Sequence, residues 1–181
     1  MMKEQTGSDE ITNILRDMRE EYWRGVTETE EARSEALECV TFVIGGESYA
    51  FETALAAEVI RLPKLVRLPK VPEIIRGVFN LRGDITAAVD IRRILGLSAP
   101  ELTPAARIIV VKAKRFMTGL IVEGVKGVEP LPMDRFEPAT RSLGGQREFI
   151  RGQFALESGM LMLLDIGKIL ESPEIIINMA E

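Results

Sequence analysis

The stretch "IRGVFNLRGDITAAVDIRRIL" (residues 75–95) decides how the rest of the chain is interpreted, because it occurs twice. Its second copy, "IRGQFALESGMLMLLDIGKIL", covers residues 150–170, and the two copies align without a gap. Nine of the 21 positions are identical, where ordinary composition gives roughly 1–2 matches. The identical pairs are Ile75/Ile150, Arg76/Arg151, Gly77/Gly152, Phe79/Phe154, Leu81/Leu156, Asp90/Asp165, Ile91/Ile166, Ile94/Ile169 and Leu95/Leu170. Such a repeat predicts two copies of one structural unit.

The sequence around the two copies has the pattern of short strands. "CVTFVIGGESYAFET" (39–53) consists of two β-type runs around Gly45-Gly46, which predicts a hairpin. Short strands are expected to continue through 56–90 and 106–132, with a tight turn near Lys114-Arg115 and a loop at 141–148. "IRRILG" predicts one or two helical turns that Gly96 ends. We therefore predict an all-β protein of small barrels or a sandwich.

The repeat also sets the expected boundaries. One β unit is expected at about 39–98 and the second at about 106–171, with a proline-marked linker between them and a tail at 172–181. Residues 1–38 form a separate, acidic extension.

That extension holds most of the negative charge of the chain. Residues 1–38 contain 5 Lys/Arg and 11 Asp/Glu, which leaves 18 and 17 of the chain's 23 and 28 for the remainder. Residues 9–26 are predicted to form an amphipathic helix, with Ser8 or Asp9 as N-cap. Three roles are open for this helix: packing on the body, docking on a partner, or loose order. Its apolar residues are Ile11, Ile14, Leu15, Met18, Tyr22 and Val26.

Composition excludes several classes of function. The chain has no histidine, so Ser-His-Asp and Cys-His catalysis and Cys/His zinc sites are impossible. Cys39 is the only cysteine, so no intrachain disulfide can form, and the net charge of −5 disfavours broad nucleic-acid binding. There is no apolar run of roughly 20 residues and no signal-peptide pattern, so we expect a cytoplasmic protein. We expect no metal, no cofactor and no catalysis; a small enzyme would need a polar pocket that the sequence does not indicate.

The two copies differ in the middle, where the first has an "NLRG" turn. The differing pairs are Asn80/Ala155, Arg82/Glu157, Gly83/Ser158 and Asp84/Gly159. A turn needed only for architecture would be similar in both copies, so a special role is predicted for the first. Two roles are open for Arg82: it extends from the hairpin into solvent, or its planar guanidinium ties the turn to a neighbouring carboxylate or carbonyl at an interface. The RGD triplet at 82–84 is attributed to chance, and the glycines do not form a phosphate-binding loop.

The identical positions favour structural roles. Asp90 and Asp165 each open a "D-I-x-x-I-L" segment, where an aspartate is predicted to cap the free N–H groups of a helix. Gly77 and Gly152 are predicted where the backbone needs a positive φ or close packing.

The stretch "IIRGVFNLRGDITAAVDIRRILGL" (residues 74–97) strongly resembles the CheW-like family of chemotaxis coupling proteins, whose usual run is close to F/I-I-x-G-V-x-N-L-R-G-x-I-x-P-V-x-D-L-R-x-x-L-G. The resemblance extends over about residues 39–171. It implies two intertwined five-stranded SH3-like β-barrels. It also implies a non-catalytic adaptor, or scaffold, that joins the cytoplasmic tips of chemoreceptors (methyl-accepting chemotaxis proteins) to the regulatory domain of the histidine kinase CheA. Further CheW-like subunits are possible partners, and recruitment to membrane receptor arrays is expected.

The resemblance also implies which residues bind partners. Gly77, Asn80, Leu81, Arg82 and Gly83 match the strand and turn of the family motif, Glu58 and Val59 match the strand lining the receptor side, and Val128 and Gly152 match coupling positions of the second unit.

Two features depart from the family pattern. Ala87 stands where the family usually has proline, so an edge strand that is softer or differently paired is expected there. The acidic extension is the second departure. An alternative function is therefore a regulatory binding module of another chemosensory-like pathway (pili or development), recruited through the N-terminal helix.

Overall fold

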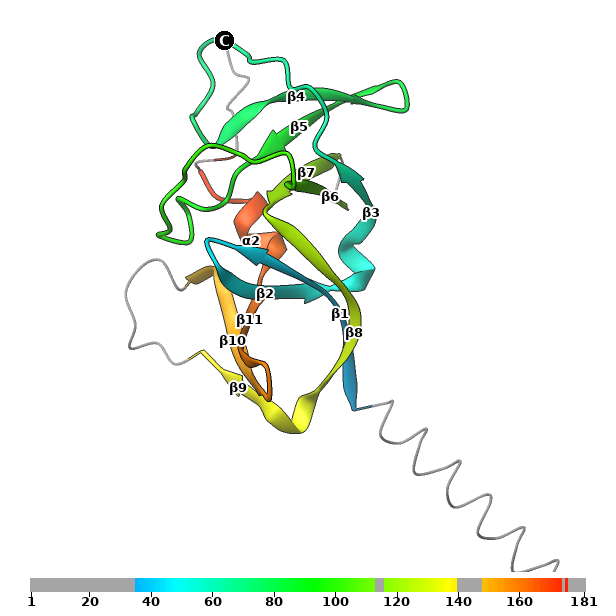
Figure 1. The fold of residues 1–181 in the computed structure, drawn as a ribbon, viewed down its shortest axis with the longest axis vertical. Helices are drawn as coiled ribbons and strands as arrows, with labels where there is room; N and C mark the ends of the chain where they lie inside the picture. Colours follow the sequence, from blue (N-terminus) through cyan, green and yellow to red (C-terminus); the bar gives the residue numbers. More distant parts are fainter. Residues whose placement is uncertain (1–34, 113–115, 140–147, 174, 176–181) are drawn as a thin grey trace, which may run out of the picture.

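The computed structural model describes residues 35–112, 116–139, 148–173 and 175, arranged as Figure 1 shows. The helix expected over 9–26 and the turn expected near Lys114-Arg115 lie outside the described residues, as do most of the expected loop at 141–148 and most of the tail. The all-β prediction is confirmed. The strands are β1 (Ala36–Ile44), β2 (Glu47–Glu52), β3 (Ala56–Arg61), β4 (Ile75–Leu81), β5 (Asp84–Val89), β6 (Arg107–Lys112), β7 (Met117–Val122), β8 (Gly124–Pro132), β9 (Phe136–Pro138), β10 (Ile150–Leu156) and β11 (Gly159–Leu164). The helical elements are the 3-10 turns η1 (Thr53–Leu55) and η2 (Met133–Arg135) and the helix α2 (Ile166–Leu170).

The strand sequences follow the position of each strand in its sheet. β7 lies between two neighbours at the middle of a sheet, and all its residues except Met117 are buried, as a continuous apolar run predicts. β3 lies at the end of the strand order and alternates between exposed and half-buried residues, as a strand with one solvent face does.

Two sheets contain these strands, and each draws on both halves of the chain. The six-stranded sheet has the order β8-β1-β2-β11-β10-β9, and the five-stranded sheet has the order β3-β6-β7-β5-β4. The chain leaves the first sheet after β2 through η1 and returns to it between β7 and β8. The expected units at 39–98 and 106–171 are therefore not the two barrels, because the barrels exchange strands across the repeat boundary.

Three smaller expectations also change. β1 begins at Ala36, which pairs with Pro132, so the body starts three residues before the expected boundary. The three-residue strand β9 gives one sheet a sixth strand. Ala87 does not lie on an edge, because β5 has β4 on one side and β7 on the other, with Ala87 opposite Val78 and Thr118.

The five-stranded sheet closes on itself beyond β3. Val66 and Val78 exchange two backbone hydrogen bonds, with N···O distances of 2.9 and 2.8 Å. This pair joins β4, at one end of the strand order, to the segment that follows β3, at the other end. The contact completes a small barrel and removes part of its open edges.

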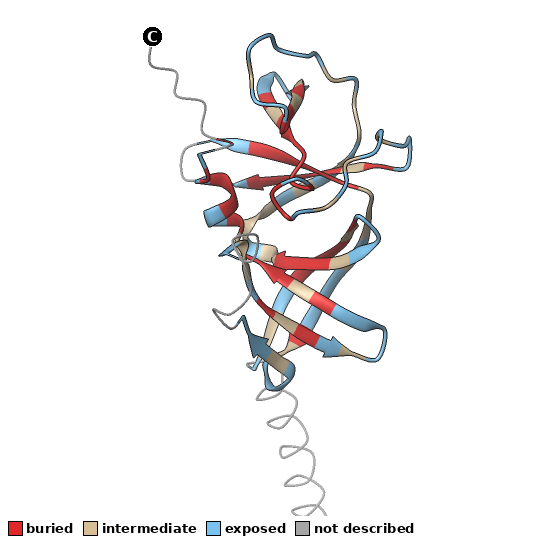
Figure 2. Ribbon diagram, turned by 90° about the vertical axis from the view of Figure 1, so that its left-hand side faces the viewer, coloured by how far each residue is buried: buried red, intermediate tan, exposed pale blue. Residues whose placement is uncertain are grey.

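Three apolar clusters are formed by the described part of the chain. One lies inside each barrel, around Phe79 and Ile108 in the five-stranded barrel and around Phe154 and Leu163 in the six-stranded one. The third and largest contains residues of both barrels and of α2, among them Phe42, Leu120 and Ile169. Burial runs along the strands and α2, whereas the connecting loops are mostly exposed (Figure 2). The two barrels therefore share the largest apolar cluster, in addition to the one that each barrel has inside it.

The repeat is visible in the backbone. Hairpins β4–β5 and β10–β11 each have a two-residue loop and a register shift just after their first residue, between Ile75 and Gly77 and between Ile150 and Gly152. Asp90 N donates to Ile74 O, and Asp165 N donates to Phe149 O, both at 2.8 Å and both at equivalent positions of the two copies. The sequence alignment of the copies therefore matches their three-dimensional equivalence.

Candidate functional site

The "NLRG" turn joins β4 to β5 as a tight two-residue loop. Leu81 pairs with Asp84, so Arg82 and Gly83 form the loop, and both have positive φ (55° and 104°). Positive φ at both loop positions defines the mirror-image turn whose twist matches a β-hairpin. Asn80 Oδ1 accepts a hydrogen bond from Gly83 N at 2.8 Å, which holds the turn from one side. The turn of the second copy lacks this amide, because Ala155 takes the place of Asn80.

Arg82 connects this turn to β3. Its guanidinium nitrogen NH2 lies 2.9 Å from Glu58 Oε2, and the two side chains are 79% and 26% exposed. The side chain both reaches solvent and meets a carboxylate, and a role of Arg82 at an interface stays a prediction. β3 and β4 are at opposite ends of the strand order, so this ion pair spans the closure of the barrel. Val59, beside Glu58, is 45% exposed.

The residues implied by the family resemblance do not gather in one place. Glu58, Val59, Asn80, Arg82 and Gly83 lie together on the five-stranded barrel, at β3 and the β4–β5 turn. Leu81 is half-buried and packs against the interior of that barrel.

The second-barrel positions lie on the other sheet. Val128 is on β8, opposite Val40, and is 59% exposed. Gly152 is on β10 and is buried. The candidate surface therefore has two parts, one on each barrel.

Gly77 and Gly152 are held among backbone atoms of the chain itself. A methyl group on Gly77 would lie 2.6 Å from Val66 O, and Gly77 has a φ of 148°. A methyl group on Gly152 would meet the Glu137 carbonyl and lie 2.5 Å from the Phe136 ring. Both glycines are buried, so neither is placed to contact a partner directly.

Asp165 and Asp90 have different environments. Asp165 Oδ1 accepts a hydrogen bond from Lys168 N at 3.0 Å at the start of α2. Asp90 precedes a single helical turn that ends at Gly96, and its carboxylate mainly binds a side chain. Arg92 Nε donates to Oδ1 at 2.9 Å and Arg92 NH2 donates to Oδ2 at 2.7 Å, so the pair is bidentate. The expectation of a simple cap at Asp90 is corrected: its one backbone contact, from Arg92 N, is long at 3.3 Å.

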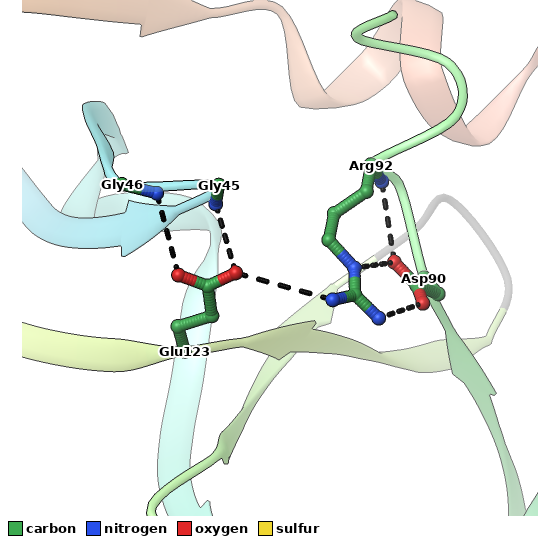
Figure 3. Close-up of polar contacts among 5 residues, drawn as sticks. All are labelled: Gly45, Gly46, Asp90, Arg92 and Glu123. Carbon is green, nitrogen blue, oxygen red and sulfur yellow. Dashed lines mark hydrogen bonds and ion pairs between the residues drawn. The ribbon is translucent and has the colours of Figure 1, made fainter. Parts of the chain in front are cut away.

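Arg92 belongs to a polar cluster at the junction of the barrels, shown in Figure 3. The Asp90 and Arg92 side chains are almost fully buried, at 4% and 3% exposure, and the hydrogen bonds from Arg92 to Asp90 raise the pKa of Arg92 against the opposing effect of burial. Glu123 lies 3.9 Å from Arg92 NH1, and its carboxylate accepts hydrogen bonds from Gly45 N at 2.9 Å and Gly46 N at 3.4 Å. The sequence analysis missed this cluster. The available signal was Arg92 itself, which stands opposite Gly167 in the repeat.

Cys39 and the acidic side chains are candidates for nucleophilic and metal chemistry. The Cys39 thiol is fully buried, and burial, with the nearby Glu52 carboxylate, raises its pKa to about 12, so it is no nucleophile near neutral pH. In the described ranges, no cluster of three or more Cys, Asp or Glu side chains is placed to hold a metal ion, and no helix is long and apolar enough to cross a bilayer. Exposed apolar side chains occur on both barrels, among them Val59, Ile85, Val128 and Met160.

Comparison with known proteins gives consistent matches. The sequence profile of the CheW-like domain matches residues 38–174. The chain is 30% identical over 138 residues to Chemotaxis protein CheW of Klebsiella aerogenes, covering 76% of this chain and 83% of that protein. It is also 30% identical over 124 residues to Protein PilI of Pseudomonas aeruginosa, covering 68% and 70%. The crystal structure of the scaffolding protein TtCheW from Thermoanaerobacter tengcongensis matches with a TM-score of 0.70 at 25% identity, covering 77% of this chain and 95% of that one.

The profile match includes both barrels, both copies of the repeat and the "NLRG" turn. A match over this much of the sequence, together with the same fold, shows that the chain belongs to the CheW-like domain family.

Proposed function

We propose that this protein is a non-catalytic adaptor of a chemosensory array, which couples the cytoplasmic tips of chemoreceptors to the regulatory domain of the histidine kinase CheA. It works in the cytoplasm and is recruited to receptors at the membrane. Membership of the CheW-like family and the similarity to a scaffolding protein support this role. The adaptor transmits the signal through contacts that differ between the kinase-on and kinase-off states.

The observation that carries the proposal is the Arg82–Glu58 contact beside the ordered turn. Asn80 fixes the turn and Glu58 orients one nitrogen of Arg82, while most of the guanidinium faces solvent. A guanidinium that is positioned before binding loses less freedom when a partner arrives, and it is suited to planar acceptors. Val59 follows Glu58 on β3 and adds exposed apolar area on the other face of that strand, and an amphipathic helix of a receptor tip would place its apolar face there.

The two-part surface suits a protein that holds two partners at once. The turn and β3 lie on the five-stranded barrel, whereas Val128 is exposed on β8 of the six-stranded barrel. A single-site module would need only one of these surfaces. In this proposal the kinase and the receptor occupy separate surfaces, and further CheW-like subunits can use either one.

Arg82→Ala tests the proposal. An exposed ion pair contributes about 0–1 kcal/mol, so the variant should keep its fold and nearly its melting temperature. In a reconstituted receptor–CheA–adaptor assay, kinase activation should fall about fivefold or more. A fivefold change corresponds to the lower end of the coupling free energies that are typical between two sites. The matched control is Arg93→Ala, which removes an exposed arginine paired with Glu73 outside the candidate surface. Wild-type kinase activation by Arg82→Ala would show that this turn has no coupling role.

The second candidate is a regulatory binding module of another chemosensory-like pathway, recruited through the N-terminal extension. The similarity to Protein PilI supports this second candidate, because the chain is as similar to PilI as to CheW of Klebsiella aerogenes, at 30% identity to each. The test is capture of the regulatory domain of CheA by the full chain and by a variant lacking residues 1–34, a cut that spares β1. Equal capture by both proteins supports the receptor–kinase adaptor, and capture that is lost with the extension supports the second candidate.

A further inference from the structure

Glu123 lies where the chain crosses from one barrel to the other. β7 of the five-stranded sheet ends at Val122, and β8 of the six-stranded sheet begins at Gly124. Glu123 N donates to Val43 O on β1 at 2.9 Å. The residue that connects the two sheets is therefore itself hydrogen-bonded to the six-stranded sheet. The side chain of Glu123 therefore extends from the connection between the two barrels.

On one side, this side chain holds the tip of the β1–β2 hairpin. Ile44 pairs with Glu47, which leaves Gly45 and Gly46 as the two-residue loop, with φ of 60° and 76°. Both loop N–H groups donate to the Glu123 carboxylate. The other side of the tip packs on Leu97, because a methyl group on Gly45 would lie 2.9 Å from Leu97 Cδ1.

On its other side, Glu123 faces the buried Asp90–Arg92 pair. Asp90 directly follows β5 of the five-stranded barrel, and its carboxylate binds Arg92 through two hydrogen bonds. A buried guanidinium is stable only where carboxylates surround it, and Glu123 is the second carboxylate at 3.9 Å. A continuous polar path thus runs from the end of β5, through Arg92 and Glu123, to the hairpin tip of the other barrel (Figure 3).

The repeat indicates that this path is not needed to fold the "D-I-x-x-I-L" segment. In the second copy, Gly167 takes the position of Arg92, and Asp165 binds Lys168 N instead. The second segment forms its helical turn without any arginine. Arg92 is therefore specific to the first copy, at the place where that copy meets the six-stranded barrel.

We infer that Arg92 and Glu123 are positioning residues, which set the relative orientation of the two barrels. The shared apolar core determines that the barrels stay together, but apolar contact has little directional preference. The hydrogen bonds from the loop N–H groups hold the Glu123 carboxylate in one place on the six-stranded barrel. Its ion pair with Arg92, at 3.9 Å, is the polar contact that crosses to the five-stranded barrel and favours one orientation among those the core allows. If the proposed adaptor function is correct, this orientation also keeps the Arg82 turn and Val128 at a fixed spacing, so that receptor and kinase are coupled.

If Glu123 sets the orientation of the barrels, its removal should change the distance between them in the isolated protein. Spin labels are attached at Ile85→Cys and Met160→Cys, which are exposed, equivalent positions of the two copies, one on each barrel. The native thiol of Cys39 is fully buried and remains unlabelled. Double electron–electron resonance then gives the distance distribution between the barrels. We expect one narrow distribution in the parent and a broader or shifted one in Glu123→Ala.

The matched control is Glu52→Ala. Glu52 is 36% exposed, against 37% for Glu123. It pairs with Arg151 of the same six-stranded barrel, so Glu52→Ala should leave the inter-barrel distance distribution unchanged. Glu123→Gln, which keeps an oxygen acceptor but removes the charge facing Arg92, provides a second, milder variant. A distribution unchanged in both Glu123 variants, even with a lower melting temperature, would overturn the inference, because a purely stabilising residue gives that result.

The kinase assay separates this inference from the proposed function. We expect Glu123→Ala to lower kinase activation about fivefold or more while Glu52→Ala does not. A broadened distribution with full kinase activation would leave the positioning role intact and contradict the two-part coupling surface. An unchanged distribution with lost activation would contradict the positioning role and leave the proposed adaptor function standing.

Discussion

At the scale of single residues, the repeat contains two aspartates, Asp90 and Asp165, that have different roles although both open the same "D-I-x-x-I-L" pattern. Asp90 and Asp165 receive equivalent backbone contacts, with their N–H groups donating to Ile74 and Phe149. Their carboxylates differ, because one binds the buried Arg92 side chain and the other caps α2. Sequence reasoning predicted a cap for both, since the capping pattern is local. The ion pair depends on burial at the barrel junction, which the local pattern does not contain.

Substituting each aspartate by alanine should separate the two roles. Asp90→Ala leaves a buried guanidinium with only the more distant Glu123, and removal of one partner of a buried pair costs about 3–5 kcal/mol. Asp165→Ala removes one partly exposed capping bond, which costs about 1 kcal/mol. Urea denaturation followed by circular dichroism gives both free energies of unfolding. Equal losses for the two variants would contradict the distinction.

At the scale of strands and hairpins, many features of the structure could be predicted from the sequence. The hairpin at Gly45-Gly46, the equivalence of β4–β5 with β10–β11, and close backbone packing at the two shared glycines all followed from strand patterns and self-similarity. Hairpins are local, so their residues and turn chemistry lie together in the sequence. The "NLRG" turn was also singled out from sequence, as the part of the hairpin that the second copy does not share. Its partner Glu58 on β3 was implied by the family resemblance, but the ion pair follows only from barrel closure.

The packing of β10 against β9 makes Gly152 a sensitive position. In Gly152→Ala, the new methyl group meets the Glu137 carbonyl and the Phe136 ring, so β9 must shift and the free energy of unfolding should fall by about 1–3 kcal/mol. Gly124→Ala is the control, because a methyl group there has no atom within 4 Å. Thermal denaturation of both variants measures the difference. A melting temperature for Gly152→Ala as high as that for Gly124→Ala would mean that β9 adapts without cost.

At the scale of the whole molecule, the exchange of strands between barrels could not be predicted from the residues. The repeat predicted two successive units, because self-similarity reports which segments resemble each other and not which segments pair. The decisive contacts join distant residues: β5 pairs in parallel with β7, and β11 pairs in parallel with β2. These pairs place each hairpin of the repeat beside a strand from the opposite half of the chain. The family resemblance implied intertwined barrels, and the pairings give the physical form of that intertwining.

Because each barrel needs strands from both halves, neither half should fold alone. A fragment of residues 35–98 keeps β1 to β5 but lacks β8 and β11 beside the first hairpin and β6 and β7 beside the others. It also loses part of the shared core, to which both halves contribute. We expect fragments 35–98 and 106–175 to give poorly dispersed amide spectra separately by nuclear magnetic resonance. An equimolar mixture should give a dispersed spectrum like that of the intact chain, because the missing pairings are restored between molecules. A dispersed spectrum and a cooperative melt from 35–98 alone would show that strand exchange is not required for folding, and that the first half forms a barrel of its own.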